Sequence, residues 1–217
     1  MRRNQRFGIA TGVGIFVLAV LVMASSAAAG VVVVPPRPGQ VGVSVSGLYG
    51  TFLKQGDFGS EFSSGPGLAV RLRYRMRYER AFGLTFEVHN ADVRPGDFPD
   101  LIVPTTTYPA GDPFAAQRAN LYLYGIDFYQ LFGTRTKTTR MLNVGAGIAH
   151  PVIDLEDGEK EFPWSDGVFV NAGAGFERFF WQGLAWELGA RYQAVFINGS
   201  TNHDLRVSAG LVFYASL

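Results

Sequence analysis

The segment that most constrains the fold runs from residue 68 to residue 78, where apolar and cationic residues alternate strictly. Its even positions are Leu68, Val70, Leu72, Tyr74, Met76 and Tyr78, and its odd positions from 71 to 77 are all arginines. Side chains alternate between the two faces of a β-strand, whereas on a helix these arginines would scatter around the axis. The segment therefore predicts a strand with one apolar and one charged face. A soluble β-sandwich and a membrane barrel with a polar interior both remain compatible with it.

The N-terminus has the organisation of a signal peptide, which favours the membrane barrel. A basic stretch up to Arg6 precedes an apolar stretch, and Ala27-Ala28-Ala29 supplies small residues for cleavage. We expect residues 1–29 to be the signal peptide, with cleavage at or near Ala29, and residues 30–40 to form an extended lead-in. An uncleaved membrane anchor is the alternative interpretation.

The composition suits one all-β domain over residues 41–217. Of the 217 residues, 14% are aromatic, 27 are glycine and none is cysteine, which excludes disulfides and thiol chemistry. Removing the signal segment takes away three arginines and no acids, so the formal charge falls from +1 to about −2. A nearly neutral protein of this kind gives no electrostatic reason to expect a nucleic-acid partner.

Alternating segments recur along the whole mature chain. The eight predicted strands span residues 41–52, 66–79, 82–91, 118–132, 140–149, 167–180, 184–196 and 203–217. Loops that start near residues 54, 92, 151 and 197 follow the odd strands, the first three of them long, while short turns follow the even strands. Long extracellular loops and short periplasmic turns are typical of outer-membrane barrels. We therefore predict an all-β fold: an eight-stranded antiparallel up-and-down transmembrane β-barrel with both ends in the periplasm.

In strand number, alternation and loop asymmetry, residues 41–217 resemble the small eight-stranded outer-membrane barrels of Gram-negative bacteria, the family of the OmpA transmembrane domain and OmpX. The last strand resembles the signal that the barrel-assembly machinery recognises in this family, through Ser208, Gly210, Phe213 and Ala215. Leu217 departs from the usual terminal Phe. The resemblance implies a location in the bacterial outer membrane, with membrane lipid and the assembly machinery as partners.

The charged residues on the inward faces of the predicted strands form a candidate network. They are Arg71, Arg73, Arg75, Arg77, Arg191 and Arg206, against Glu87, Asp127, Glu177 and Glu187. The interior of an eight-stranded barrel is just wide enough for side chains to fill it, and buried charges must pair. Two interpretations remain open at this stage: a salt-bridged plug, or a narrow anion-selective path along the arginines.

Two weaker motifs offer candidate sites of chemistry. His203 and Asp204 lie beside Ser200 near the predicted outer rim, as in a hydrolase acting on lipid head groups. Adjacent residues of one strand point to opposite faces, however, so we expect no enzyme. The acidic loop 151–166 could hold a hard cation or be a solvated loop. We expect no cofactor and no metal.

The function expected from these features is structural or interactional. A monomeric barrel would stabilise the envelope or present loops 92–117 and 151–166 to an extracellular ligand. A small porin-like channel for solutes or apolar compounds is the first alternative, and a lipid-modifying enzyme is the second.

Overall fold

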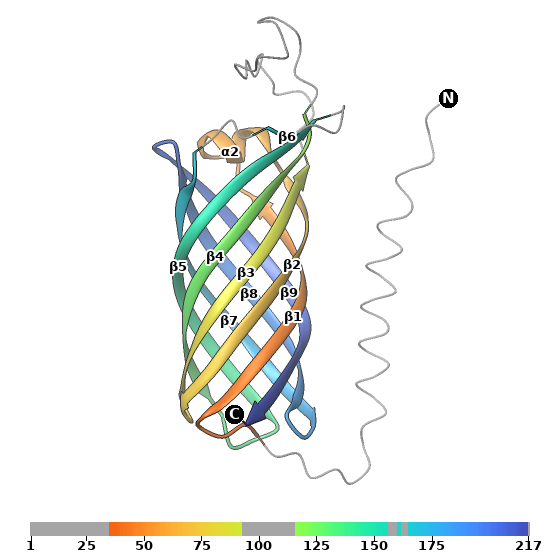
Figure 1. Ribbon diagram of the computed structural model, residues 1–217, viewed down its shortest axis with the longest axis vertical. Helices are drawn as coiled ribbons and strands as arrows, with labels where there is room; N and C mark the ends of the chain where they lie inside the picture. The colour runs from red at the N-terminus through yellow and green to blue at the C-terminus, as the bar shows by residue number, and fades with distance from the viewer. Residues whose placement is uncertain (1–34, 93–115, 156–159, 162–164, 217) are drawn as a thin grey trace, which may run out of the picture.

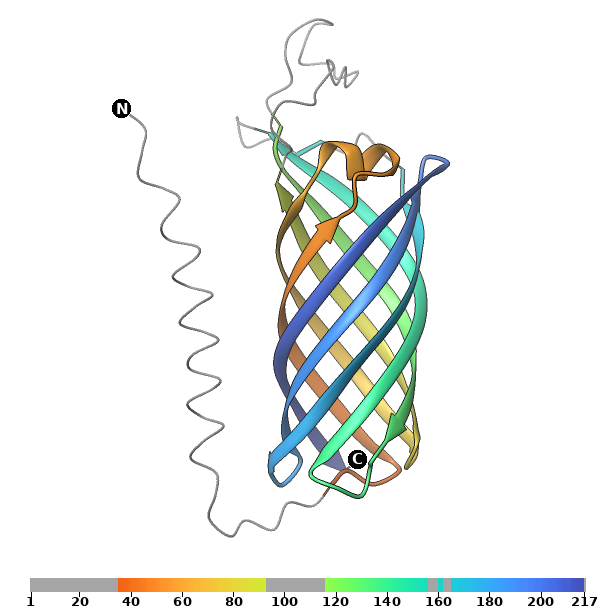
Figure 2. The same ribbon diagram turned by 180° about the vertical axis from the view of Figure 1, so that it is seen from behind.

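The chain forms a closed antiparallel β-barrel (Figures 1 and 2). The structure, a computed structural model, describes residues 35–92, 116–155, 160–161 and 165–216. Its elements are β1 (Gln40–Phe52), α2 (Gly56–Glu61), β2 (Ser64–Arg77), β3 (Arg80–Asp92), β4 (Ala116–Phe132), β5 (Thr138–Leu155), β6 (Lys160–Glu161), β7 (Gly167–Trp181), β8 (Leu184–Ile197) and β9 (Ser200–Ser216).

Every long strand pairs with two neighbours, so the barrel has no open edge. The strands follow the order β4-β3-β2-β1-β9-β8-β7-β5, and a further pairing of β4 with β5 closes the ring. The two-residue strand β6 pairs only with the end of β5. Eight strands therefore make the wall, and the predicted fold class is confirmed.

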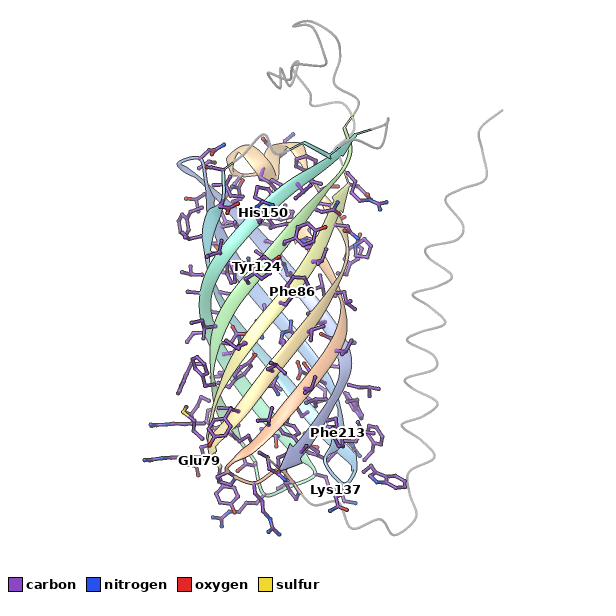
Figure 3. The ribbon with its side chains drawn as sticks, viewed as in Figure 1. Glu79, Phe86, Tyr124, Lys137, His150 and Phe213 are labelled. Atoms are coloured by element: carbon purple, nitrogen blue, oxygen red, sulfur yellow. The ribbon has the colours of Figure 1, made fainter. Side chains whose placement is uncertain are left out.

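The outside of the barrel is an apolar belt. Leu68, Leu72 and Tyr74 of β2 all face outward, with exposed fractions of 51%, 43% and 46%. On β3 and β4, the rings of Phe86 and Tyr124 lie 5.2 Å apart on the outer surface (Figure 3). A closed barrel whose outward positions are large and apolar over all its strands belongs in hydrocarbon.

The interior is divided into layers of different chemistry. Charged and polar side chains fill the middle, between apolar clusters at the two ends. The cluster at the end with the long loops consists of Phe52, Phe58, Phe62, Ala91, Ala119, Leu121, Leu123, Ala149, Phe169, Val195 and Ile197. The inward positions of Leu121 and Leu123, which disturb the alternation of β4 in the sequence, are explained by this layer.

Helix α2 forms within a stretch that the sequence indicates to be a simple polar loop. Phe58 of the helix and Phe62, the residue that caps its C-terminus, are both buried. Their ring centroids lie 4.7 Å apart, and the Phe58 ring lies 4.8 Å from that of Phe52. The helix lies at one mouth of the barrel (Figure 1). Its buried aromatic side chain and that of its capping residue therefore close this mouth. Within the described residues, no helix is long and apolar enough to cross a bilayer.

Two strand boundaries differ from prediction for identifiable reasons. Strand β5 continues past Pro151 to Leu155, because its pairing with β7 ends at the pair Ala149–Gly167 and the missing N–H of proline costs no hydrogen bond on that side. The expected loop 197–202 is a two-residue hairpin turn instead. Asn198 and Gly199 both have positive φ, 50° and 78°, as the tightest hairpin turns require.

The two ends of the barrel are unequal, and we take the end with short turns as periplasmic. Both the start of β1 and the end of β9 lie there (Figure 2). The predicted signal peptide, nearly all of loop 92–117 and part of loop 151–166 lie outside the described residues.

Candidate functional site: the buried ionic network

Strand β2 supplies the cations of the network because its inward positions are arginines. Arg71, Arg73 and Arg75 alternate with lipid-facing residues, and their exposed fractions are 2%, 1% and 0%. Strand β7 stands four strands away from β2 in either direction around the barrel. A bridge from Arg73 to Glu177 on β7 therefore crosses the full width of the lumen.

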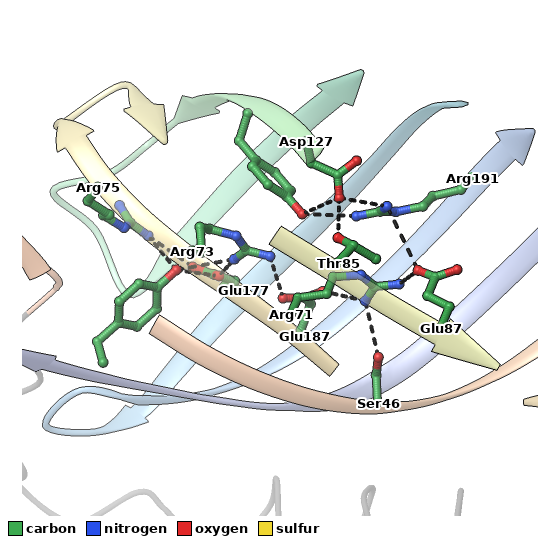
Figure 4. Close-up of polar contacts among 12 residues, drawn as sticks. Ser46, Arg71, Arg73, Arg75, Thr85, Glu87, Asp127, Glu177, Glu187 and Arg191 are labelled. Atoms are coloured by element: carbon green, nitrogen blue, oxygen red, sulfur yellow. Dashed lines mark hydrogen bonds and ion pairs between the residues drawn. The ribbon is translucent and has the colours of Figure 1, made fainter. Parts of the chain in front are cut away.

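The ion pairs form a continuous chain, which Figure 4 shows from Arg75 to Glu87. They are Arg75–Glu177 at 3.0 Å, Arg73–Glu177, Arg73–Glu187 at 2.9 Å, Arg71–Glu187 at 3.5 Å, Arg71–Glu87 at 2.5 Å and Arg206–Glu87 at 2.8 Å. Each carboxylate in this chain bridges two guanidinium groups. Charge-assisted hydrogen bonds of this kind are about twice as strong as neutral ones.

A second branch of the network is centred on Asp127 of β4. Its Oδ2 accepts hydrogen bonds from the Thr85 hydroxyl at 2.5 Å, from the Tyr129 hydroxyl at 3.0 Å and from Arg191 at 3.0 Å. Arg191 also lies 3.9 Å from Glu87, which joins the two branches. Two neutral hydroxyl groups and one guanidinium thus share this oxygen, while Oδ1 accepts a hydrogen bond from the Asn171 amide at 3.3 Å.

Two tyrosines close the network toward the periplasm. The Tyr214 hydroxyl donates to Glu177 at 2.7 Å, and its ring lies 4.9 Å from the Arg75 guanidinium carbon. The Tyr129 ring lies 4.4 Å from the corresponding carbon of Arg73. Aromatic faces therefore contact the parts of the arginines that carboxylates leave free.

Charge is balanced across the buried network. Its members are five arginines, Arg71, Arg73, Arg75, Arg191 and Arg206, and five carboxylates, Glu87, Asp127, Glu177, Glu187 and Asp204. The cavity between Asn143, Glu187 and Arg191 measures about 10 Å³, room for about one water molecule at most. In the part of the chain that the structure describes, charged side chains fill the lumen at this level.

Sequence reasoning placed one residue in the network wrongly and missed two others. Arg77 is exposed, because the register of β2 against β3 shifts between Arg75 and Arg77 and breaks the alternation there. Asp204, expected near the outer rim beside His203, is fully buried and bonded to Arg206. His89 lies 3.5 Å from Asp204 and stacks on Phe52, a role that its inward position on β3 could have suggested.

The remaining candidate residues lie on separate surfaces. His203 points outward, where its Nδ1 lies 2.5 Å from the Tyr192 hydroxyl, while Asp204 points into the lumen. Of the residues that resemble the assembly signal, Ser208 and Gly210 are partly covered and Phe213 and Ala215 are exposed. All four lie on β9, which pairs with β1 and β8.

Comparison with known proteins identifies the fold. No family model and no curated protein sequence matches the chain. Among solved structures, Neisserial surface protein A superposes with a TM-score of 0.54 at 15% identity, covering 80% of this chain and 95% of that one. The outer membrane protein OprG from Pseudomonas aeruginosa gives 0.55 at 12% identity, covering 85% and 100%. The outer membrane protein AlkL, solved in lipid bilayers, gives 0.52 at 12% identity, covering 88% and 94%.

The chain has the fold of an outer-membrane β-barrel. These structural neighbours are small eight-stranded barrels of the bacterial outer membrane. The apolar belt independently requires a hydrocarbon environment. Together, the barrel fold and its exterior place the protein in the bacterial outer membrane.

Proposed function

We propose that this protein is a closed barrel with a structural and surface-contact role, of the same kind as the OmpA transmembrane domain and OmpX. The observation that carries the proposal is the crossing of the lumen by Arg73 and Glu177, which are 1% and 0% exposed. Side chains that a water molecule cannot reach leave no aqueous path at their level. The barrel then acts as a sealed and stiff element of the envelope.

The energetics of the network support a permanent closure. Removing one partner from a buried ion pair typically costs about 3–5 kcal/mol, because the other charge is left without compensation. Opening a path would separate several such pairs at once. The aromatic layer beneath α2 adds a second seal, since Phe58 and Phe62 fill the extracellular mouth.

A sealed barrel can still bind a ligand at its extracellular end. We propose that loops 92–117 and 151–166 supply the contact surface for an extracellular ligand, with α2 and the β8–β9 hairpin as its rim. The rigid wall beneath them supports this role, because binding residues commonly lie on loops held by a rigid scaffold. One of the similar structures is, by its name, a surface protein.

We propose a non-enzymatic role for the described part of the protein. Two adjacent residues of one strand could serve the same nucleophilic triad only if both side chains reached one side of the strand. His203 contacts Tyr192 on the outer surface, and Asp204 binds Arg206 inside the barrel. This separation supports a binding or structural role over hydrolysis of lipid head groups.

Conductance in planar lipid bilayers tests the proposal. We expect the purified wild-type barrel to show no steady channel. The matched variant R73A/E177A removes the bridge across the lumen together with both of its charges. We expect this variant to conduct ions. A steady, anion-selective conductance of the wild type would refute the sealed barrel and favour a small channel.

A further inference from the structure

The periplasmic end of the barrel carries an excess of positive charge that the ionic network does not use. The exposed cationic residues there are Arg37, Arg77, Arg80, Arg135, Lys137, Arg140 and Arg178, against the single carboxylate of Glu79 among the described residues of that end. None of these cations takes part in an ion pair within the described ranges. Like charges gathered in this way favour an anionic partner.

Two of the cations, Arg80 and Arg135, line one groove. The groove measures about 490 Å³ and lies between the start of β3 and the turn that joins β4 to β5. Arg80 comes from the start of β3 and Arg135 from the turn, and Phe132 and Glu79 line the groove with them. Its walls are tied together, because the Leu131 amide donates to the Glu79 carbonyl at 2.8 Å. Glu79 and Lys137 mark this end of the molecule in Figure 3.

Both arginines are exposed and line the same groove, so their N–H groups are available to an anionic ligand. The Arg135 guanidinium carbon lies 5.4 Å from the centre of the Tyr78 ring, and the residue is exposed. Arg80 is the first residue of β3 and points to the same side as Phe82, two residues further along the lipid-facing row. Guanidinium groups bind phosphate through paired N–H donors.

The surroundings of the groove show which kind of anion it fits. Further along the same rim, Arg140 is paired across strands with both Phe132 and Phe176, and Arg178 with Trp186. Cations flanked by outward aromatic residues, just below an apolar belt, are arranged like the head-group boundary of a bilayer. A ligand here can place its phosphate on the arginines and its acyl chains on the belt. A soluble anion would gain nothing from that second contact.

We propose that the groove between Arg80 and Arg135 binds the phosphodiester of an anionic phospholipid in the periplasmic leaflet. The cation excess of the rim favours an anionic head group over a zwitterionic one, even with Glu79 at the groove. This site is independent of whether the lumen is sealed, so it goes beyond the closed-barrel function and its failure would leave that function untouched.

Native mass spectrometry of the detergent-solubilised full chain tests the site. The barrel is titrated with phosphatidylglycerol or with phosphatidylcholine of identical acyl chains, and the bound adducts are counted. We expect a clear preference for phosphatidylglycerol in the wild type. In R80Q/R135Q the preference should fall by about 25-fold, since each basic side chain near an anionic surface contributes about fivefold.

Three variants separate the groove from general electrostatics. R80K/R135K should keep much of the preference because it keeps both charges. Arg118→Gln, at the opposite end of the barrel, should leave the preference unchanged, and R140Q/R178Q should reduce it less than the groove pair does. Equal binding of both lipids by the wild type, or an equal loss in R140Q/R178Q and R80Q/R135Q, would overturn the proposal. A heat-modifiability gel verifies that every variant is folded.

Discussion

Replacing Glu177 with glutamine is the sharpest perturbation of the ionic network. This carboxylate binds Arg73 and Arg75 and accepts the hydrogen bond of Tyr214, and it is fully buried. Glutamine has nearly the same volume, so the change removes charge without creating a cavity. The effect on stability therefore reports on electrostatics and hydrogen bonding.

The size of the loss in stability depends on which ion pairs Arg73 and Arg75 keep after Glu177 loses its charge. Arg73 keeps Glu187 at 2.9 Å, whereas Glu177 is the only carboxylate within ion-pair distance of Arg75 among the described residues. Since Arg75 is 0% exposed, its charge would remain buried beside little more than the face of Tyr214. Breaking a buried pair in this way costs about 3–5 kcal/mol. We expect Glu177→Gln to lower the free energy of unfolding by that amount.

Equilibrium unfolding by guanidinium chloride, after refolding into lipid vesicles, measures this loss. Glu79→Gln, an exposed carboxylate at the rim, is the matched control and should change stability by no more than about 0.5 kcal/mol. The double variant R75M/E177M removes both members of the pair and should recover part of the loss. If Glu177→Gln lowered the free energy of unfolding by less than about 1 kcal/mol, the idea that the buried arginines require the Glu177 carboxylate for compensation would be refuted.

Three further changes probe the parts of the barrel around the network. Phe62→Ala empties the aromatic layer beneath α2 and should cost about 3–5 kcal/mol in the same unfolding assay, while a loss near zero would mean that α2 is not a packed cap. Gly147→Ala should cost about 1–3 kcal/mol, because its new carbon would lie 2.0 Å from the Tyr124 carbonyl oxygen, whereas Gly47→Ala meets nothing within 4 Å and should be neutral. Arg77→Gln should also leave stability unchanged, since Arg77 lies outside the network. A loss of stability as large as that of Glu177→Gln would instead indicate that Arg77 is buried in the lumen.

The barrel itself could be predicted because its signal is local. Alternation of apolar and polar residues along each strand reflects the pleat, and it needs no knowledge of the neighbouring strands. The same rule placed Arg71, Arg73 and Arg75 inward. It failed at Arg77, where the shift in register depends on how β2 meets β3 and leaves no mark in the sequence of β2 alone.

The pairing inside the lumen could not be predicted, because it depends on the closure of the ring. Arg73 and Glu177 are 104 residues apart, and they meet only because β2 and β7 stand on opposite walls. Asp204 was missed for a related reason. The predicted loop 197–202 put Asp204 next to the rim, whereas a turn of two residues with positive φ starts β9 at Ser200, and Asp204 lies inside the ladder with β8 and faces the lumen.

Spin labels on β1, placed one at a time in the cysteine-free chain, provide the most direct test of a sealed ionic lumen surrounded by lipid. Outward residues Val43 and Val45 alternate with inward residues Ser44 and Ser46, which are both 2% exposed. In lipid vesicles, we expect labels at 43 and 45 to collide with oxygen but not with a polar nickel chelate, and labels at 44 and 46 to be shielded from both. Access of the nickel chelate to 44 and 46 would reveal an open aqueous pore, and its access to 43 and 45 would show that the outer face meets water instead of hydrocarbon.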